Sequence, residues 1–206
     1  MRGQPAVEDW QPQGARLALV ALASLPVLVL GLLLFLLPLA LRTGQAGSVS
    51  VRVEVTSSNV NWAFAALIAV VVLLLLLVVV HEAIHAVLFR QLGGSPRFGV
   101  GLYGGLLPGF YVTAPGTLFS RGQFLLIALA PTVVISVVGF LLVLLAPFGG
   151  YLVVPLAAHL ACCLGDWDLA VATLQRPRGT LVEDTAVGAR FYRPGVAAPL
   201  PGPLSR

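Results

Sequence analysis

Four long runs of apolar residues dominate the hydrophobic pattern of this chain. They cover roughly residues 17–41, 62–89, 124–147 and 151–174. About 20 helical residues cross a hydrocarbon core about 30 Å thick, so each run is long enough to form a transmembrane helix. The first run exceeds the roughly 7–15 apolar residues of a signal peptide, which favours a retained helix. The pattern predicts an all-α integral membrane protein with about four transmembrane helices.

The segments between these runs have patterns of their own. Residues 48–56, SVSVRVEVT, alternate valine with polar residues, which is typical of a half-exposed β-strand. Residues 92–123, between the second and third helices, are rich in glycine, proline and aromatic residues. They predict a loop at the membrane interface that could include a β-hairpin. The short segment APFGGY, residues 146–151, predicts a tight turn between the last two helices.

Composition agrees with a membrane location. Hydrophobic residues make up 58% of the 206 residues and charged residues only 10%, against about 25% in soluble domains. The predicted organisation is a tail over residues 1–16, a four-helix membrane domain over 17–175, and a proline-rich tail over 176–206 that is partly disordered. The lipid bilayer is therefore an expected partner.

The distribution of arginine predicts the orientation. The net charge of +4 arises from twelve arginines without any lysine, and they lie in the tails and loops, which argues against a nucleic-acid partner. With four spans, both tails and the second loop share one side, and only Arg42 and Arg52 fall on the other. By the positive-inside rule, the protein is a multi-pass protein of the cell membrane with both termini in the cytoplasm.

Ionisable residues end the second apolar run, in VVVHEAIHAVLFR. An ionisable group at depth in the bilayer costs about 2.5–3.5 kcal/mol or more unless it is paired or ligated. His81 and His85 are four residues apart, so on a helix they share a face and can reach one metal ion. With Glu82 they form the HExxH pattern, in which two histidines bind zinc and the glutamate is the general base.

A simpler interpretation is that these residues mark the cytoplasmic end of the helix. Polar side chains near Arg90 could reach into the headgroups, and histidine is favoured at a helix C-terminus by the dipole. A helix end of this kind does not require the HExxH order. The order therefore favours the zinc site.

A catalytic zinc normally has three protein ligands, so a third ligand is expected elsewhere. The fourth run contains His159, Asp166 and Asp168 as its ionisable residues besides two cysteines. Asp166 lies nearly two turns after His159 on the same helix face, at about the depth of the HExxH histidines, whereas Asp168 points elsewhere. We therefore expect Asp166 to be the third ligand. His159 is expected to orient a ligand or to be the alternative ligand, and Asp168 is a weaker alternative.

Other interpretations of these residues stay open. Asp166 could be a helix-terminal aspartate paired with Arg176 or exposed to water. Cys162 and Cys163 fit small packing residues better than soft zinc ligands. Pro131 is expected to kink the third helix rather than to take part in chemistry.

These residues also resemble a known family. The HExxH at a helix end, the glycine- and aromatic-rich loop, the segment LLIALAP and a last helix carrying His and then GD are similar to the DUF3267 family of membrane zincins. That family is similar to the site-2 proteases, which are intramembrane metalloproteases whose third metal ligand is an aspartate on a later helix. The resemblance covers about residues 62–192. It implies His81 and His85 as zinc ligands, Glu82 as catalytic base and Asp166 as third ligand. The aspartate stands in CCLGDWD, which departs from the longer asparagine- and proline-containing motif of site-2 proteases.

The leading hypothesis is a membrane-embedded zinc metallopeptidase that hydrolyses peptide bonds near the cytoplasmic membrane face. Its expected cofactor is Zn²⁺, and its expected substrate is a membrane protein or peptide. The alternative is a non-catalytic metal-binding or interaction membrane protein with a structural or degenerate zincin site. A transporter is less favoured, because the four runs contain few polar positions besides this cluster.

Overall fold

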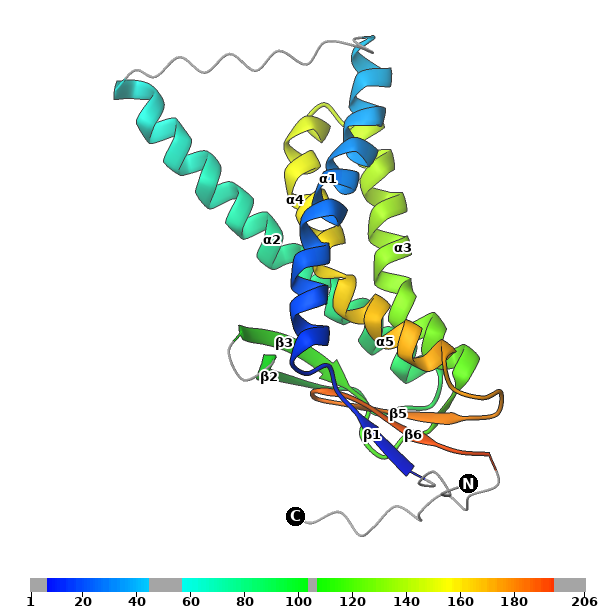
Figure 1. Cartoon of the computed structure of the whole chain (residues 1–206). Helices are drawn as coiled ribbons and strands as arrows, with labels where there is room; N and C mark the ends of the chain where they lie inside the picture. The colour runs from blue at the N-terminus through cyan, green and yellow to red at the C-terminus, as the bar shows by residue number, and fades with distance from the viewer. Residues whose placement is uncertain (1–6, 45–56, 104–106, 195–206) are drawn as a thin grey trace. The chain divides into compact units, whose positions relative to one another are not determined.

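In the computed structural model of the chain, residues 7–44, 57–103 and 107–194 are described (Figure 1). Within these residues, four helical segments are long and apolar enough to cross a membrane, which confirms the predicted number of candidate spans. These segments are Ala15–Thr43, Ala63–Gln91, Arg121–Leu145 and Gly149–Leu174. The valine-rich segment 48–56 lies outside the described residues. The last part of the second predicted tail, residues 195–206, for which disorder was predicted, also lies outside them.

The helices, in chain order, are α1 (Ala15–Thr43), α2 (Ser57–Gln91), α3 (Arg121–Leu145), the 3₁₀ turn η1 (Gly149–Leu152), α4 (Val153–Cys162) and α5 (Leu164–Leu174). The strands are β1 (Val7–Trp10), β2 (Arg97–Tyr103), β3 (Leu107–Thr113), β4 (Phe119–Ser120), β5 (Leu181–Thr185) and β6 (Gly188–Tyr192). The chain divides into two compact units. Unit 1 comprises Met1–Val20, Glu82–Pro131 and Gly165–Arg206, and unit 2 comprises Ala21–His81 and Thr132–Leu164.

The fourth predicted helix is divided. The helix α4 ends at Cys162 and α5 begins at Leu164, because Cys163 has ψ near −6° instead of about −42°. Its backbone N–H still donates to the carbonyl of His159, at 3.1 Å. Gly165 follows at once, and glycine costs a helix about 1 kcal/mol relative to alanine. The fourth predicted span is thus confirmed as Gly149–Leu174, but it is divided into a 3₁₀ turn and two helices instead of forming one continuous helix.

Unit 1 contains a four-stranded antiparallel sheet that the sequence pattern did not predict. Its strand order is β1-β6-β5-β4, so it joins residues of both predicted tails to the end of the second loop. A two-residue turn between Thr185 and Gly188 connects β5 to β6. An all-α description of the chain is thus incomplete, and the protein is mostly helical with small antiparallel sheets.

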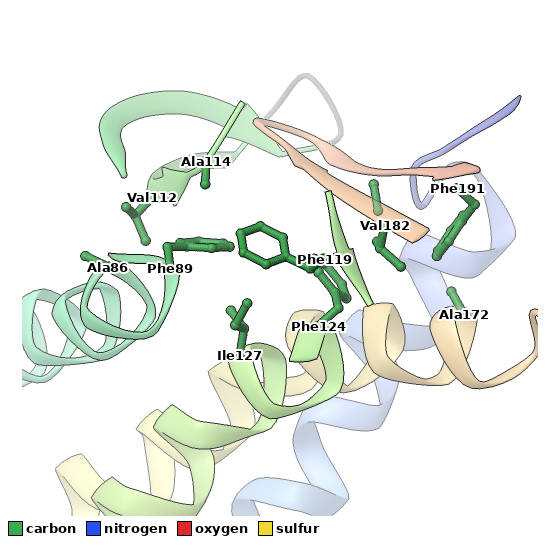
Figure 2. Close-up of a cluster of buried hydrophobic side chains, with 11 residues drawn as sticks. Ala86, Phe89, Val112, Ala114, Phe119, Phe124, Ile127, Ala172, Val182 and Phe191 are labelled. Carbon is green, nitrogen blue, oxygen red and sulfur yellow. The ribbon is translucent and has the colours of Figure 1, made fainter. Parts of the chain in front are cut away.

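Aromatic and aliphatic side chains fill the core of unit 1 (Figure 2). The rings of Phe89 in α2 and Phe119 in β4 lie 5.4 Å apart, and both are buried almost completely. Burial of each such side chain contributes about 1.5–3 kcal/mol. The core also includes Ala86, Val112, Ala114, Phe124, Ile127, Ala172, Val182, Ala189 and Phe191. It holds the last turns of α2 against α3 and the sheet.

A glycine allows β1 to join this sheet. A Cβ atom on Gly188 would lie 2.1 Å from the carbonyl oxygen of Trp10, a separation that no side chain can adopt. The strands pair with Trp10 opposite Ala189. Gly188 therefore permits the close approach of the first described strand to β6.

The second loop forms the predicted hairpin. Strands β2 and β3 pair from Arg97 opposite Thr113 to Tyr103 opposite Leu107. Phe98, Val100 and Phe110 expose 68%, 67% and 55% of their surface. The hairpin therefore presents apolar side chains outward.

Unit 2 is helical. The helices α1 and α4 approach closely where a Cβ on Gly31 would lie 3.0 Å from the Cα of Ala157. The guanidinium of Arg42, at the end of α1, donates to the carbonyls of Ala146 and Pro147. Those carbonyls belong to the predicted tight turn, which the turn η1 confirms. The arginine thus anchors α1 to the connection between α3 and α4.

Candidate metal centre

His85 lies in unit 1, near the end of α2, and is 7% exposed. Its Nδ1 atom is 3.0 Å from the carbonyl oxygen of Ile127 in α3. A carbonyl can only accept a hydrogen bond, so Nδ1 carries the proton. In the neutral ring the lone pair then resides on Nε2, which is the tautomer that a metal site with Nε2 ligation requires.

The carbonyl of Ile127 is available to His85 because of Pro131. Residue 131 is the fourth residue after Ile127 in α3, and its N–H would normally bond that carbonyl. Proline has no N–H, so this helical hydrogen bond cannot form. The sequence analysis assigned Pro131 only a kink. The structure gives it a further role, since it frees the acceptor that fixes the His85 ring.

Asp166 lies in the first turn of α5 and faces His85. The distance from His85 Nε2 to Asp166 Oδ1 is 3.7 Å. This separation is too long for a hydrogen bond. It is shorter than the sum of one Zn–N and one Zn–O bond, about 4.2 Å, so both atoms can reach one ion. The imidazole nitrogen and carboxylate oxygen are ordinary zinc ligands, and the pair fits that metal.

Asp168 forms an ion pair with Arg16. Its carboxylate is bonded by the guanidinium of Arg16, with a shortest distance of 2.7 Å. The alternative partner considered for Asp166, Arg176, instead pairs with Glu8 at 2.5 Å. Of the two aspartates in α5, Asp166 is therefore the one that lies beside His85.

His81 lies one helical turn before His85 in α2. In unit 2 its Nδ1 atom is 3.1 Å from Nε2 of His159 in α4, and the two rings meet edge to face. His159 is 4% exposed, and Cys163 beside it is fully buried. A hydrogen bond from one imidazole to the other would fix the orientation and tautomer of the His81 ring.

Glu82 follows His81 and is half-buried. Its carboxylate is close enough to the buried carboxyl of Asp184 in β5 to raise the pKa of that group. Three carboxyl groups of unit 1, those of Glu82, Asp166 and Asp184, are thus close enough to His85 to interact with it electrostatically.

Asp184 is a buried carboxyl near the candidate centre that the sequence analysis did not single out. It is 9% exposed, and burial raises its pKa to about 7, although a hydrogen bond from Thr113 opposes this shift. In the sequence Asp184 looks like one more charged residue of the second tail. Its only signal is its place two residues after Val182 in an alternating segment, which puts both side chains on the buried face of β5.

The comparison with known families is decisive for identity. A family model described as "putative zincin peptidase", DUF3267, matches residues 74–181, which are 108 of the 206 residues. The chain belongs to the DUF3267 family. No curated protein and no solved structure matches the chain. The DUF3267 match contains His81, Glu82, His85 and Asp166 and ends before Asp184.

Proposed function

We propose that this DUF3267 protein is a membrane-embedded zinc metallopeptidase that hydrolyses peptide bonds near the cytoplasmic membrane face. The observation that carries this proposal is the set of contacts made by the His85 side chain. Its ring is held as the Nδ1–H tautomer by Ile127, and its Nε2 is 3.7 Å from Asp166, within a chain of a zincin family.

The proposed zinc ligands are His81, His85 and Asp166. The continuous helix α2 supports the histidine pair, because residues four apart share one face. Zinc, when bound, acidifies water to a pKa of about 7 and polarises a carbonyl group. His159 is proposed to orient His81 through the contact between their rings. It is also the alternative ligand.

Glu82 is the proposed general base. It follows the first histidine in HExxH, the position from which a carboxylate accepts a proton from the attacking water and passes it to the leaving amine. The neighbouring carboxyl of Asp184 is buried, and burial raises its pKa to about 7. At neutral pH it is therefore only partly ionised and adds less negative charge beside Glu82 than an ordinary aspartate would.

The membrane setting is supported by the surfaces of the long helices. None of the residues in the hydrophobic window of α2 is buried within the protein. Leucines and valines such as Leu67, Val71 and Leu75 expose about half of their surface or more. Exposure of so much apolar surface to water is costly, whereas lipid accommodates it. The substrate is then a membrane protein or peptide, and an edge of the β2–β3 hairpin could pair with its extended backbone.

Turnover of peptides tests this proposal. The purified, zinc-loaded protein in detergent is incubated with a mixture of quenched fluorescent peptides that include transmembrane sequences. Wild type is expected to cleave some of them, and Glu82→Gln to be slower by about 10²–10⁴-fold, which is the usual contribution of a general base. Glu8→Gln is the control, because Glu8 lies outside the candidate centre and pairs with Arg176. Equal rates for wild type and Glu82→Gln would refute the peptidase mechanism.

A further inference from the structure

Unit 2 contains a second cluster of metal-binding side chains. His81, His159 and Cys163 offer two imidazole nitrogens and a sulfur that lie within 4.8 Å of one another. His159 and Cys163 are four residues apart at the end of α4, so they share a face there. Cys162 is exposed instead, and thus the adjacent cysteine is not part of the cluster.

The distances in this cluster agree with metal coordination. With Zn–N bonds of about 2.0–2.1 Å and a Zn–S bond of about 2.3 Å, tetrahedral ligands are separated by about 3.3 Å (N to N) and 3.6 Å (N to S). His81 Nδ1 is 3.1 Å from His159 Nε2, and Cys163 Sγ is 3.9 and 3.7 Å from these two atoms. An ion could therefore be bound with shifts of only a few tenths of an ångström.

We propose that His81, His159 and Cys163 form an alternative position for a soft, thiophilic metal ion. Thiolate with imidazole favours Zn²⁺, Cu⁺ and related ions over Mg²⁺ or Ca²⁺. When the ion binds, the Cys163 thiol loses its proton to the solvent, as metal ligation requires.

This position competes with the zinc centre proposed above, and this part of the inference rests on the proposed function. A neutral imidazole has a single nitrogen lone pair, so His81 can give it to one ion at a time. An ion bound through His81 Nδ1 therefore removes His81 as an Nε2 ligand. Excess soft metal is expected to inhibit the peptidase in this way.

Cobalt provides a direct test of the position. Co²⁺ is added to the full-length Asp166→Ala protein, in which the competing centre lacks its carboxylate. The expected result is a near-ultraviolet charge-transfer band from thiolate to Co²⁺. The band is lost when Cys163→Ser is added and is kept when the matched change Cys162→Ser is added. A band that is absent from Asp166→Ala, or that survives Cys163→Ser, would overturn the proposal.

A second variant guards against misfolding of Cys163→Ser. His159→Gln removes a nitrogen ligand but keeps the sulfur, and it should weaken Co²⁺ binding by about 10-fold or more, as read from titration of the same band. Unchanged Co²⁺ affinity in His159→Gln would also refute the proposal. The band does not depend on peptidase activity, so it distinguishes failure of this position from failure of the proposed function.

Discussion

At the scale of single residues, the candidate centre depends on groups that hold its histidines in place. Pro131 frees the carbonyl of Ile127, and that carbonyl accepts the Nδ1–H of His85. Groups that orient a ligand in this way typically change metal affinity by about 10–100-fold when they are altered. The proline therefore bears on the candidate centre through the backbone of α3.

The change Pro131→Ala tests this relation. Alanine supplies an N–H that competes with His85 for the Ile127 carbonyl, so zinc affinity is expected to fall by about 10-fold. Affinity is measured by competition with a chromophoric chelator. The melting temperature is measured in parallel, because Pro131 is fully buried and its loss also changes packing. Unchanged zinc affinity would show that the tautomer of His85 is fixed by other contacts.

Asp184 predicts a pH-dependent stability of the metal-free protein. Its carboxyl ionises near pH 3.8 in the unfolded chain but near pH 7 in the folded protein. The folded protein thus binds an extra proton between these values, and the penalty of the buried group grows as pH rises from about 4 to about 7. The free energy of unfolding of Asp184→Asn, relative to wild type, should rise over this range by up to about 4 kcal/mol. Melting temperatures of both proteins across this range provide the measurement, and a difference that is independent of pH would contradict the shift.

At the scale of elements, the sequence predicted helices well and strands poorly. The four apolar runs and the order of residues in HExxH are local patterns, so they could be read directly. The four-stranded sheet could not be predicted from local patterns, because β1 pairs with β6 more than 170 residues later and β4 has only two residues. The break at Cys163 was not predicted either, because the hydropathy of residues 151–174 as a whole stays high enough for one continuous span.

The same limits apply to the candidate centre. The HExxH pattern predicted His81, Glu82 and His85 as site residues, and the expected depth in the membrane favoured Asp166. The carbonyl of Ile127 contacts His85, and the carboxyl of Asp184 lies near enough to affect it, only through tertiary structure, which no spacing in the sequence encodes.

The change Gly188→Ala tests the attachment of β1. The added Cβ would overlap the carbonyl oxygen of Trp10, so the strand must shift or detach. A cost of about 1–3 kcal/mol is expected, as for other overpacking changes. Gly122→Ala is the matched control, because a Cβ there meets nothing within 4 Å. Thermal unfolding should show a lower melting temperature for Gly188→Ala only, and equal melting temperatures would argue against close pairing of β1 and β6.

At the scale of the whole molecule, the proposed membrane topology follows from the arginines. Ten of the twelve arginines lie in the two tails and the second loop, including its junctions with the flanking helices. We therefore expect both termini in the cytoplasm. Fluorescent-protein fusions to either terminus should fluoresce, and alkaline phosphatase fusions at the same positions should be inactive. Active phosphatase at either terminus would contradict the proposed cytoplasmic location of that terminus.

The central claim is that His81, His85 and Asp166 bind one zinc ion and that Glu82 does not. Zinc content by mass spectrometry tests it most directly, on a Cys163→Ser background that removes the thiolate position. We predict about one zinc per chain in this background and in Glu82→Gln, as expected for a site with three protein ligands. The added changes His81→Ala, His85→Ala and Asp166→Ala should each abolish binding. Zinc retained in all three variants, or absent from the background protein after reloading, would contradict the account.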